Sequence, residues 1–390
     1  MTAEWNSSAP TRLGRSARCV GVARWVRAHP LLAFVALSYA LSWGYWLPLV
    51  LTGQIVRWGS PVSQFPALLG PMLAAFAVTA VIDGKPGVRD LAARMVRWRV
   101  PLRWWLFAVG TPLLLFAIGL AVVSIGTGSP DAAELGRMAG LPDWGVLFVW
   151  AMFVLVNGLG EETGWRGYAL PVLRRRHGLL AASLLLVPIW AGWHLPLFFL
   201  LQSYRDLGPA GVPGFLIGLA CGSILLAWLY ESACCSVLIV AVWHGTYNIT
   251  VATVGAGGTI AAVVSTAVML GAAAIVWHLR RHPVGPTGSP APNPNDRLTA
   301  VVATTGVGDA GGLGPSRRSA GPRTTVPEAT RRSCCAAALM NRGRRRPAGL
   351  SDSCETVLSS VSSRVQGQPT AVRRVGRSRR DRGDAGNLLG

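Results

Sequence analysis

Two adjacent carboxylates, Glu161 and Glu162, end a strongly apolar stretch, and Arg166 follows four residues later. Residues four apart share a helix face, so Glu162 and Arg166 can pair while Glu161 lies about 100° further round the helix. One carboxylate would then be held by the guanidinium, and its neighbour would stay free to take a proton. A charge inside a membrane costs about 3 kcal/mol on insertion scales, so such residues are rare without a role in chemistry, ion transport or helix pairing. Alone, this cluster fits a general base and an ion pair between helices equally well.

Two later apolar segments each contain a histidine. Trp190 and His194 are four residues apart in the first segment, and His244 and Asn248 are four apart in the second. Taken singly, each imidazole is more often a hydrogen-bonded core residue than a catalytic one. Together with a carboxylate, however, two imidazoles and an amide are the groups needed to activate a water and stabilise an oxyanion. Six residues are therefore candidates for a hydrolytic site: Glu161, Glu162, Arg166, His194, His244 and Asn248.

The three ordered motifs, Glu-Glu-x-x-x-Arg, aromatic-x-x-x-His and His-x-x-x-Asn, resemble those of the CPBP intramembrane proteases. That Abi-like family includes CAAX prenyl endopeptidases and bacterial homologues linked to bacteriocin processing and self-immunity. The resemblance covers about residues 145–255. It implies that Glu161 activates the attacking water with help from His194. It further implies that Glu162 and Arg166 shape the site.

The resemblance assigns His244 and Asn248 to the stabilisation of the oxyanion. One carboxylate and two imidazoles could also bind zinc and leave one position open for water. The chain has no His-Glu-x-x-His motif, and a glutamate-activated water needs no ion. Whether the site binds a divalent metal such as zinc therefore stays open, and its candidate ligands are treated as catalytic residues.

The composition predicts the elements that position these side chains. Of the 390 residues, 51% are hydrophobic and only 14% are charged, which is typical of a polytopic membrane protein. Each apolar segment is long enough to cross a hydrocarbon core of about 30 Å as a helix. We therefore predict an all-α bundle of about eight transmembrane helices, at residues 31–51, 62–82, 103–125, 144–165, 179–201, 212–230, 234–253 and 259–279.

The distribution of charge predicts the orientation of this bundle. The chain has 37 basic and 17 acidic residues, a net charge of +20. Basic connections alternate with connections that are charge-poor or acidic, as the positive-inside rule requires. This pattern places both termini in the cytoplasm and the helices in the plasma membrane. It also accounts for the positive charge without a specific nucleic-acid partner.

Three regions follow from these patterns. Residues 1–30 form a basic cytoplasmic segment, and residues 31–281 form the transmembrane domain. Residues 282–390 are rich in Arg, Pro and Gly and have no sustained period, so we predict a disordered tail. A passive solvated tail is the simplest interpretation. Contacts of its arginines with anionic lipid or nucleic acid, and a coding artefact, are the alternatives.

One geometric difficulty concerns depth in the bilayer. His194 lies roughly 20–25 Å from the cytoplasmic start of its helix, whereas Glu161 is expected in the cytoplasmic half of the preceding one. The two can meet only if the helix boundaries differ from those given above, or if one helix is tilted or broken.

The leading hypothesis is an intramembrane endopeptidase that cleaves a peptide or protein substrate near the cytoplasmic leaflet. One alternative is a non-catalytic immunity or scaffold protein that keeps the polar cluster for packing. Another is a proton-coupled transporter that uses Glu161 and Glu162 as proton carriers. The native substrate and the oligomeric state stay open.

Overall fold

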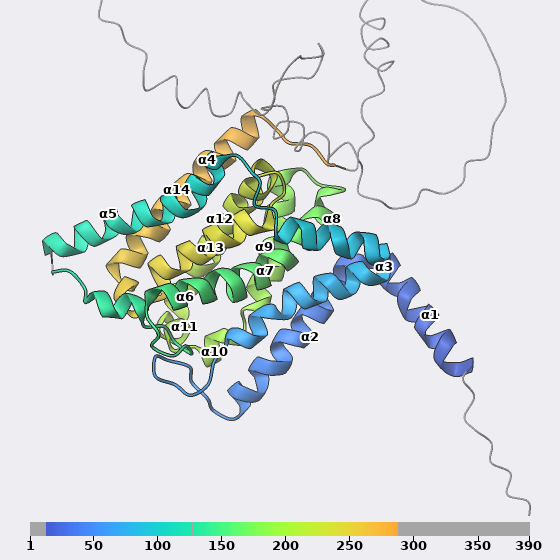
Figure 1. Cartoon of the computed structure of the whole chain (residues 1–390), viewed down its shortest axis with the longest axis horizontal. Coiled ribbons are helices and arrows are strands. Elements are labelled where there is room, and N and C mark those ends of the chain that lie inside the picture. Colours follow the sequence, from blue (N-terminus) through green and yellow to red (C-terminus); the bar gives the residue numbers. More distant parts are fainter. Residues whose placement is uncertain (1–12, 127, 288–390) are drawn as a thin grey trace, which may run out of the picture. The chain divides into compact units, whose positions relative to one another are not determined.

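The computed structural model describes residues 13–126 and 128–287, and these residues are almost entirely helical (Figure 1). Within these two ranges there is no β-strand, and one isolated bridge joins Val56 to Leu201. The predicted all-α fold is therefore confirmed. Most of the predicted N-terminal segment forms helix α1, Leu13–Ala28. The predicted disordered tail lies outside the described residues except for 282–287.

Within the described residues, seven helical stretches are long and apolar enough to cross a membrane. They are Pro30–Leu51, Phe65–Met95, Leu102–Gly126, Val146–Arg174, Leu179–Leu200, Gly208–Ser232 and Thr259–Arg281. They contain helices α2 (Pro30–Leu51), α3 (Gly70–Met95), α5 (Thr111–Gly126), α9 (Leu179–Trp193), α12 (Gly208–Ser232) and α14 (Thr259–Arg281). Shorter helices α4 (Leu102–Trp105), α10 (Leu197–Leu200) and α11 (Gln202–Asp206) connect or extend them.

The eighth apolar segment is a shorter helix, α13, Val237–Ala252. Its 16 residues span about 24 Å, less than the thickness of a hydrocarbon core. It packs against α5, α12 and α14 and against the helical stretch Val146–Arg174. A helix surrounded in this way does not need to reach both membrane surfaces, because its polar side chains face protein. The helix that carries His244 and Asn248 is therefore an internal one.

The stretch Val146–Arg174 alternates between α-helical and wider π-helical turns. It consists of α6 (Val146–Met152), η4 (Phe153–Gly158), α7 (Leu159–Gly164), η5 (Trp165–Ala169) and α8 (Leu170–Arg174), with η4 and η5 the π-helical parts. π-Helical turns inside α-helices often occur at functional sites. Here they flank α7, the short helix that carries both glutamates.

Glycines at the two ends of α7, one just before it in η4 and one at its last residue, allow close contacts with neighbouring helices. A Cβ atom on Gly158 would lie 2.5 Å from the carbonyl oxygen of Ala241 in α13. A Cβ atom on Gly164 would lie 2.5 Å from the Cβ of Pro71 in α3. Small residues at such contacts let helix backbones meet, as is common for helices packed in lipid. The glutamates are thus held between α3 and α13.

The structure resolves the difficulty with depth. The stretch that carries Glu161 continues to Arg174, nine residues beyond the boundary predicted at 165. Glu161 then lies 13 residues, or about 20 Å, from the Arg174 end. His194 lies 15 residues, or about 22 Å, from Leu179, where the next helix begins. Because a short turn joins these two ends, both side chains lie at a similar depth.

Arg174 ends its helix as a buried cation with several partners. Its Nε lies 2.5 Å from Oε1 of Glu231, and its side chain is 3% exposed. Its Nη1 donates to the carbonyls of His177 and Gly285, each at 2.8 Å. The backbone N–H of Thr287 donates to the Arg174 carbonyl at 2.9 Å, so residues after α14 are attached to the turn between α8 and α9.

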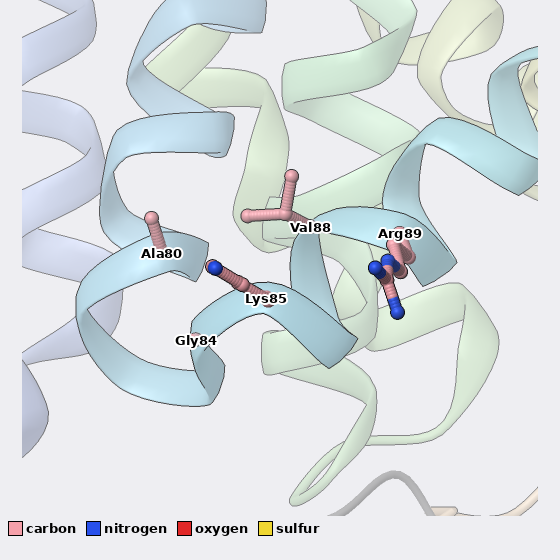
Figure 2. A pocket seen from close by; sticks show the side chains of 5 residues that line it. All are labelled: Ala80, Gly84, Lys85, Val88 and Arg89. Atoms are coloured by element: carbon pink, nitrogen blue, oxygen red, sulfur yellow. The ribbon is translucent and has the colours of Figure 1, made fainter.

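Helix α3 bends at Gly84, whose φ of 62° is a conformation that glycine adopts without strain. A hollow of about 350 Å³ lies at this bend. Figure 2 shows the residues that line it, Ala80, Gly84, Lys85, Val88 and Arg89. The sequence predicted that the helix ends at 82, but it resumes after the bend and continues to Met95. The basic connection is therefore partly helical.

Candidate active site

Glu162 lies at the centre of a buried ionic cluster. Its Oε1 lies 2.9 Å from Nη1 of Arg166 and 2.8 Å from Nδ1 of His244. The side chains of Glu162 and Arg166 are both 0% exposed. The pairing of residues four apart is therefore present, and His244 joins it from α13. The guanidinium also lies over the Trp190 ring, with 4.4 Å between Cζ and the ring centroid.

Glu161 has different partners from its neighbour. Its Oε1 accepts a hydrogen bond of 2.5 Å from Nδ2 of Asn157, and its Oε2 accepts one of 2.8 Å from Nε1 of Trp190. Both donors are neutral, and the residue is 2% exposed. The two adjacent carboxylates therefore have separate roles in the cluster: Glu162 is bound by a cation, and Glu161 is held by an amide and an indole.

His194 lies just after the last residue of α9, where the chain turns into α10. Its Nδ1 lies 2.7 Å from the carbonyl oxygen of Trp190. A carbonyl only accepts, so Nδ1 carries the hydrogen, and Nε2 of the neutral ring is an acceptor. The rings of Tyr204 and Phe215 pack against the imidazole, at centroid distances of 6.3 and 5.6 Å.

His244 and Asn248 approach the same cluster from α13. The His244 ring meets the Trp190 ring edge-on, with 5.9 Å between the centroids. Nδ2 of Asn248 donates to Oδ1 of Asn157, the residue that also holds Glu161. The six residues predicted from the motifs are thus connected, directly or through Asn157 and Trp190, within the described part of the chain.

Two features of the site were not predicted from the sequence: the part played by Asn157, and the hydrogen bond from Trp190 to Glu161. Asn157 precedes Glu161 by four residues, the same spacing that linked Glu162 to Arg166. A systematic search for polar residues four positions before each glutamate would have found it. The indole N–H of Trp190 has no such signal, because only the fold places it against Glu161.

A three-ligand zinc site does not fit these side chains. Within residues 13–126 and 128–287 no three His, Cys, Asp or Glu side chains are grouped so that they could hold a metal ion. Oε1 of Glu162 is bound by both Arg166 and His244, which leaves it unsuited to a metal ion. We therefore derive no step through a metal.

Seven helices of spanning length around a buried polar cluster define a multi-pass membrane protein. Residues 143–250, which contain all six predicted site residues, match the family model "Type II CAAX prenyl endopeptidase Rce1-like". The segment that holds the site therefore matches this family of proteases, and the resemblance inferred from the motifs is confirmed. The chain is also similar to CAAX prenyl protease 2 of Methanococcus maripaludis. The two are 24% identical over 232 residues, which cover 57% of this chain and 83% of the relative.

Proposed function

We propose that this protein is an intramembrane endopeptidase in which Glu161 activates a water for attack on a peptide bond. The observation that supports this most strongly is the difference between the two carboxylates. Glu162 is bound by Arg166 and His244, whereas the described residues that donate to Glu161, Asn157 and Trp190, are both neutral. A carboxylate that is not held by a cation can turn a lone pair to a water, as a general base must.

The proposed reaction has two steps. The oxygen of the water attacks the peptide carbonyl carbon, and Glu161 takes the proton that the water releases. Nε2 of His194 accepts the other water hydrogen in a hydrogen bond and so orients the attacking lone pair. The carbon–nitrogen bond of the tetrahedral intermediate then breaks, and protonated Glu161 returns its proton to the leaving amine. The products are a new carboxyl group and a new amine.

We assign stabilisation of the oxyanion to His244 and Asn248. Nδ1 of His244 faces Glu162, so Nε2 can donate to an oxyanion when the ring is an imidazolium. In that form the formal charges of the buried cluster, two carboxylates, one guanidinium and one imidazolium, sum to zero. A neutral sum avoids the high cost of a buried net charge. Asn248 uses one N–H for Asn157 and keeps a second for the substrate.

The substrate class follows from the membrane setting. A site about 20 Å from the ends of its helices receives either a transmembrane segment or a protein terminus that enters from the surface. The positive-inside pattern supports a plasma-membrane protein with both termini in the cytoplasm and a substrate that enters from that side. The name of the relative, CAAX prenyl protease 2, makes prenylated and unprenylated CAAX-type peptides the first substrates to test.

The test compares wild type with Glu161→Gln in reconstituted vesicles, using a peptide library that includes prenylated CAAX peptides. Loss of the general base should lower kcat by about 10²–10⁴-fold, whereas the folded state persists because Gln has nearly the same shape. Glu134→Gln is the matched control, since that carboxylate is 35% exposed and lies outside the cluster.

Three results would contradict the proposal. The first is wild-type protein that cleaves no peptide of the library. The second is proton-coupled flux into the vesicles that requires Glu162, which would support a transporter instead. Glu161→Gln that cleaves like wild type would remove Glu161 from the mechanism.

A further inference from the structure

Among the described residues, Asn157 is the one side chain that hydrogen-bonds both the proposed base and Asn248, a proposed oxyanion donor. It lies at the end of η4, one turn before Glu161, and is 6% exposed. Its Nδ2 donates to Oε1 of Glu161 at 2.5 Å, and its Oδ1 accepts from Nδ2 of Asn248. These two bonds join the helical stretch of the first motif to α13, which carries the third.

The direction of this chain of hydrogen bonds is fixed by chemistry. An ionised carboxylate only accepts, so Asn157 must turn its NH₂ group to Glu161. Its carbonyl oxygen then faces α13, and Asn248 must donate a hydrogen bond to it from its own NH₂ group. The charge on Glu161 therefore determines the orientation of both amides. The second N–H of Asn248 is left available in a defined direction.

The backbone around Asn157 supports the contact. Gly158, the next residue, lies so close to α13 that an added Cβ would be 2.5 Å from the Ala241 carbonyl oxygen. From the other side, a Cβ on Gly245 would be 2.7 Å from the backbone nitrogen of Val154. Two glycines thus bring η4 and α13 together at the level where the two asparagines meet.

We propose that Asn157 is a positioning residue that couples the orientation of the Glu161 carboxylate to that of the Asn248 amide. When one of the two groups moves, the other loses its partner, so base and oxyanion donor are arranged together or not at all. This inference rests on the proposed peptidase function.

The test uses two substitutions with different chemistry. Asn157→Leu removes both hydrogen bonds at similar volume. Asn157→Asp keeps an acceptor for Asn248 but places a second carboxylate against Glu161. We expect each to lower kcat by about 100-fold at pH 8, with little change in KM, because a misplaced catalytic group costs about this much.

The pH profile separates positioning from a merely structural role. In Asn157→Asp, one proton shared by the two carboxyls restores the hydrogen bond, so activity should recover as the pH falls. Asn157→Leu cannot recover in this way. The other ionisable groups of the cluster are unchanged in both variants: Glu161, Glu162, Arg166, His194 and His244.

Thr246→Val is the matched control. Thr246 is a buried polar residue of α13 that accepts from Nε1 of Trp150 at 3.1 Å and donates to the Val242 carbonyl at 2.7 Å. The Thr246→Val variant should lose stability as the Asn157 variants do, but it should keep the wild-type kcat.

The inference is overturned if Asn157→Leu cleaves like wild type. It is also overturned if Asn157→Asp keeps the wild-type pH profile. In both cases the proposed function survives, because wild type still cleaves. Wild-type protein without any cleavage would overturn the function and this inference together.

Discussion

The buried pair of Arg166 and Glu162 allows a quantitative test of what holds the site together. Replacing Arg166 by Met leaves the Glu162 charge with His244 as its remaining partner, and removing one member of a buried pair costs about 3–5 kcal/mol. The lost contact between the guanidinium and Trp190 adds about 2 kcal/mol. Two nitrogens of Arg166, Nε and Nη2, have no hydrogen-bond partner among the described residues. Such unsatisfied buried donors destabilise the folded state, so their removal offsets about 1–3 kcal/mol of the loss.

We therefore expect Arg166→Met to lower the free energy of unfolding by about 4 kcal/mol, and Glu162→Gln to lower it by a similar amount. In the double variant both charges of the Arg166–Glu162 pair are removed together, and the carbonyl of the introduced amide can still accept a hydrogen bond from His244. The loss should then be smaller than the sum of the single losses by about 3 kcal/mol.

The measurement is reversible unfolding in mixed detergent micelles, followed by circular dichroism and tryptophan fluorescence, for all four proteins of the cycle. Additive losses, within about 0.5 kcal/mol, would refute the argument, because they would mean that the two charges do not depend on each other. The double variant also separates stability from catalysis, since it should fold and yet cleave poorly.

Three further predictions concern the elements around the site. Gly158→Ala should lower both stability and kcat, because its Cβ would lie 2.5 Å from the Ala241 carbonyl oxygen. The control is Gly271→Ala in α14, where an added Cβ would have no described atom of a neighbouring element within 4 Å. It should leave stability unchanged or raise it by about 0.5–1 kcal/mol in the same unfolding assay. Arg174→Met should lower the free energy of unfolding by about 3 kcal/mol, and an unchanged unfolding midpoint would show that its buried pair with Glu231 contributes nothing. Ser236→Ala should cost about 1 kcal/mol, since Oγ accepts from the Ile239 N–H at the start of α13, and Ser236→Thr should restore most of it.

The apolar segments and the four-residue spacings of the motifs could be predicted from the sequence. Apolar runs report directly which stretches avoid water, and residues four apart on a helix must share a face. The contact between Glu162 and Arg166 followed from this rule alone. The prediction that α7, α9 and α13 lie side by side depended on the resemblance of their motifs to those of a known family, because no local pattern indicates which helices are neighbours.

Two features could not be predicted, for physical reasons. Hydropathy ends the fourth segment at 165 because charged residues follow. Arg166 is nevertheless buried beside Glu162 of the same stretch, and Arg174 is buried beside Glu231, which the fold brings from α12. Likewise, the eighth segment has the composition of a spanning helix, but α13 is surrounded by protein and is only 16 residues long. In both places the residues contact other parts of the protein, whereas hydropathy averaged along the sequence treats them as exposed to water or lipid.

The attachment of residues 282–287 affects where the chain can be shortened for biochemical work. Hydropathy alone would suggest a new C-terminus at Arg281, the last residue of α14. Such a cut would remove the backbone bonds of Val284 to Leu179 and of Thr287 to Arg174, and with them the Gly285 carbonyl that binds Arg174. A chain that ends a few residues beyond Thr287 keeps all three bonds, and should be the more stable starting point for purification.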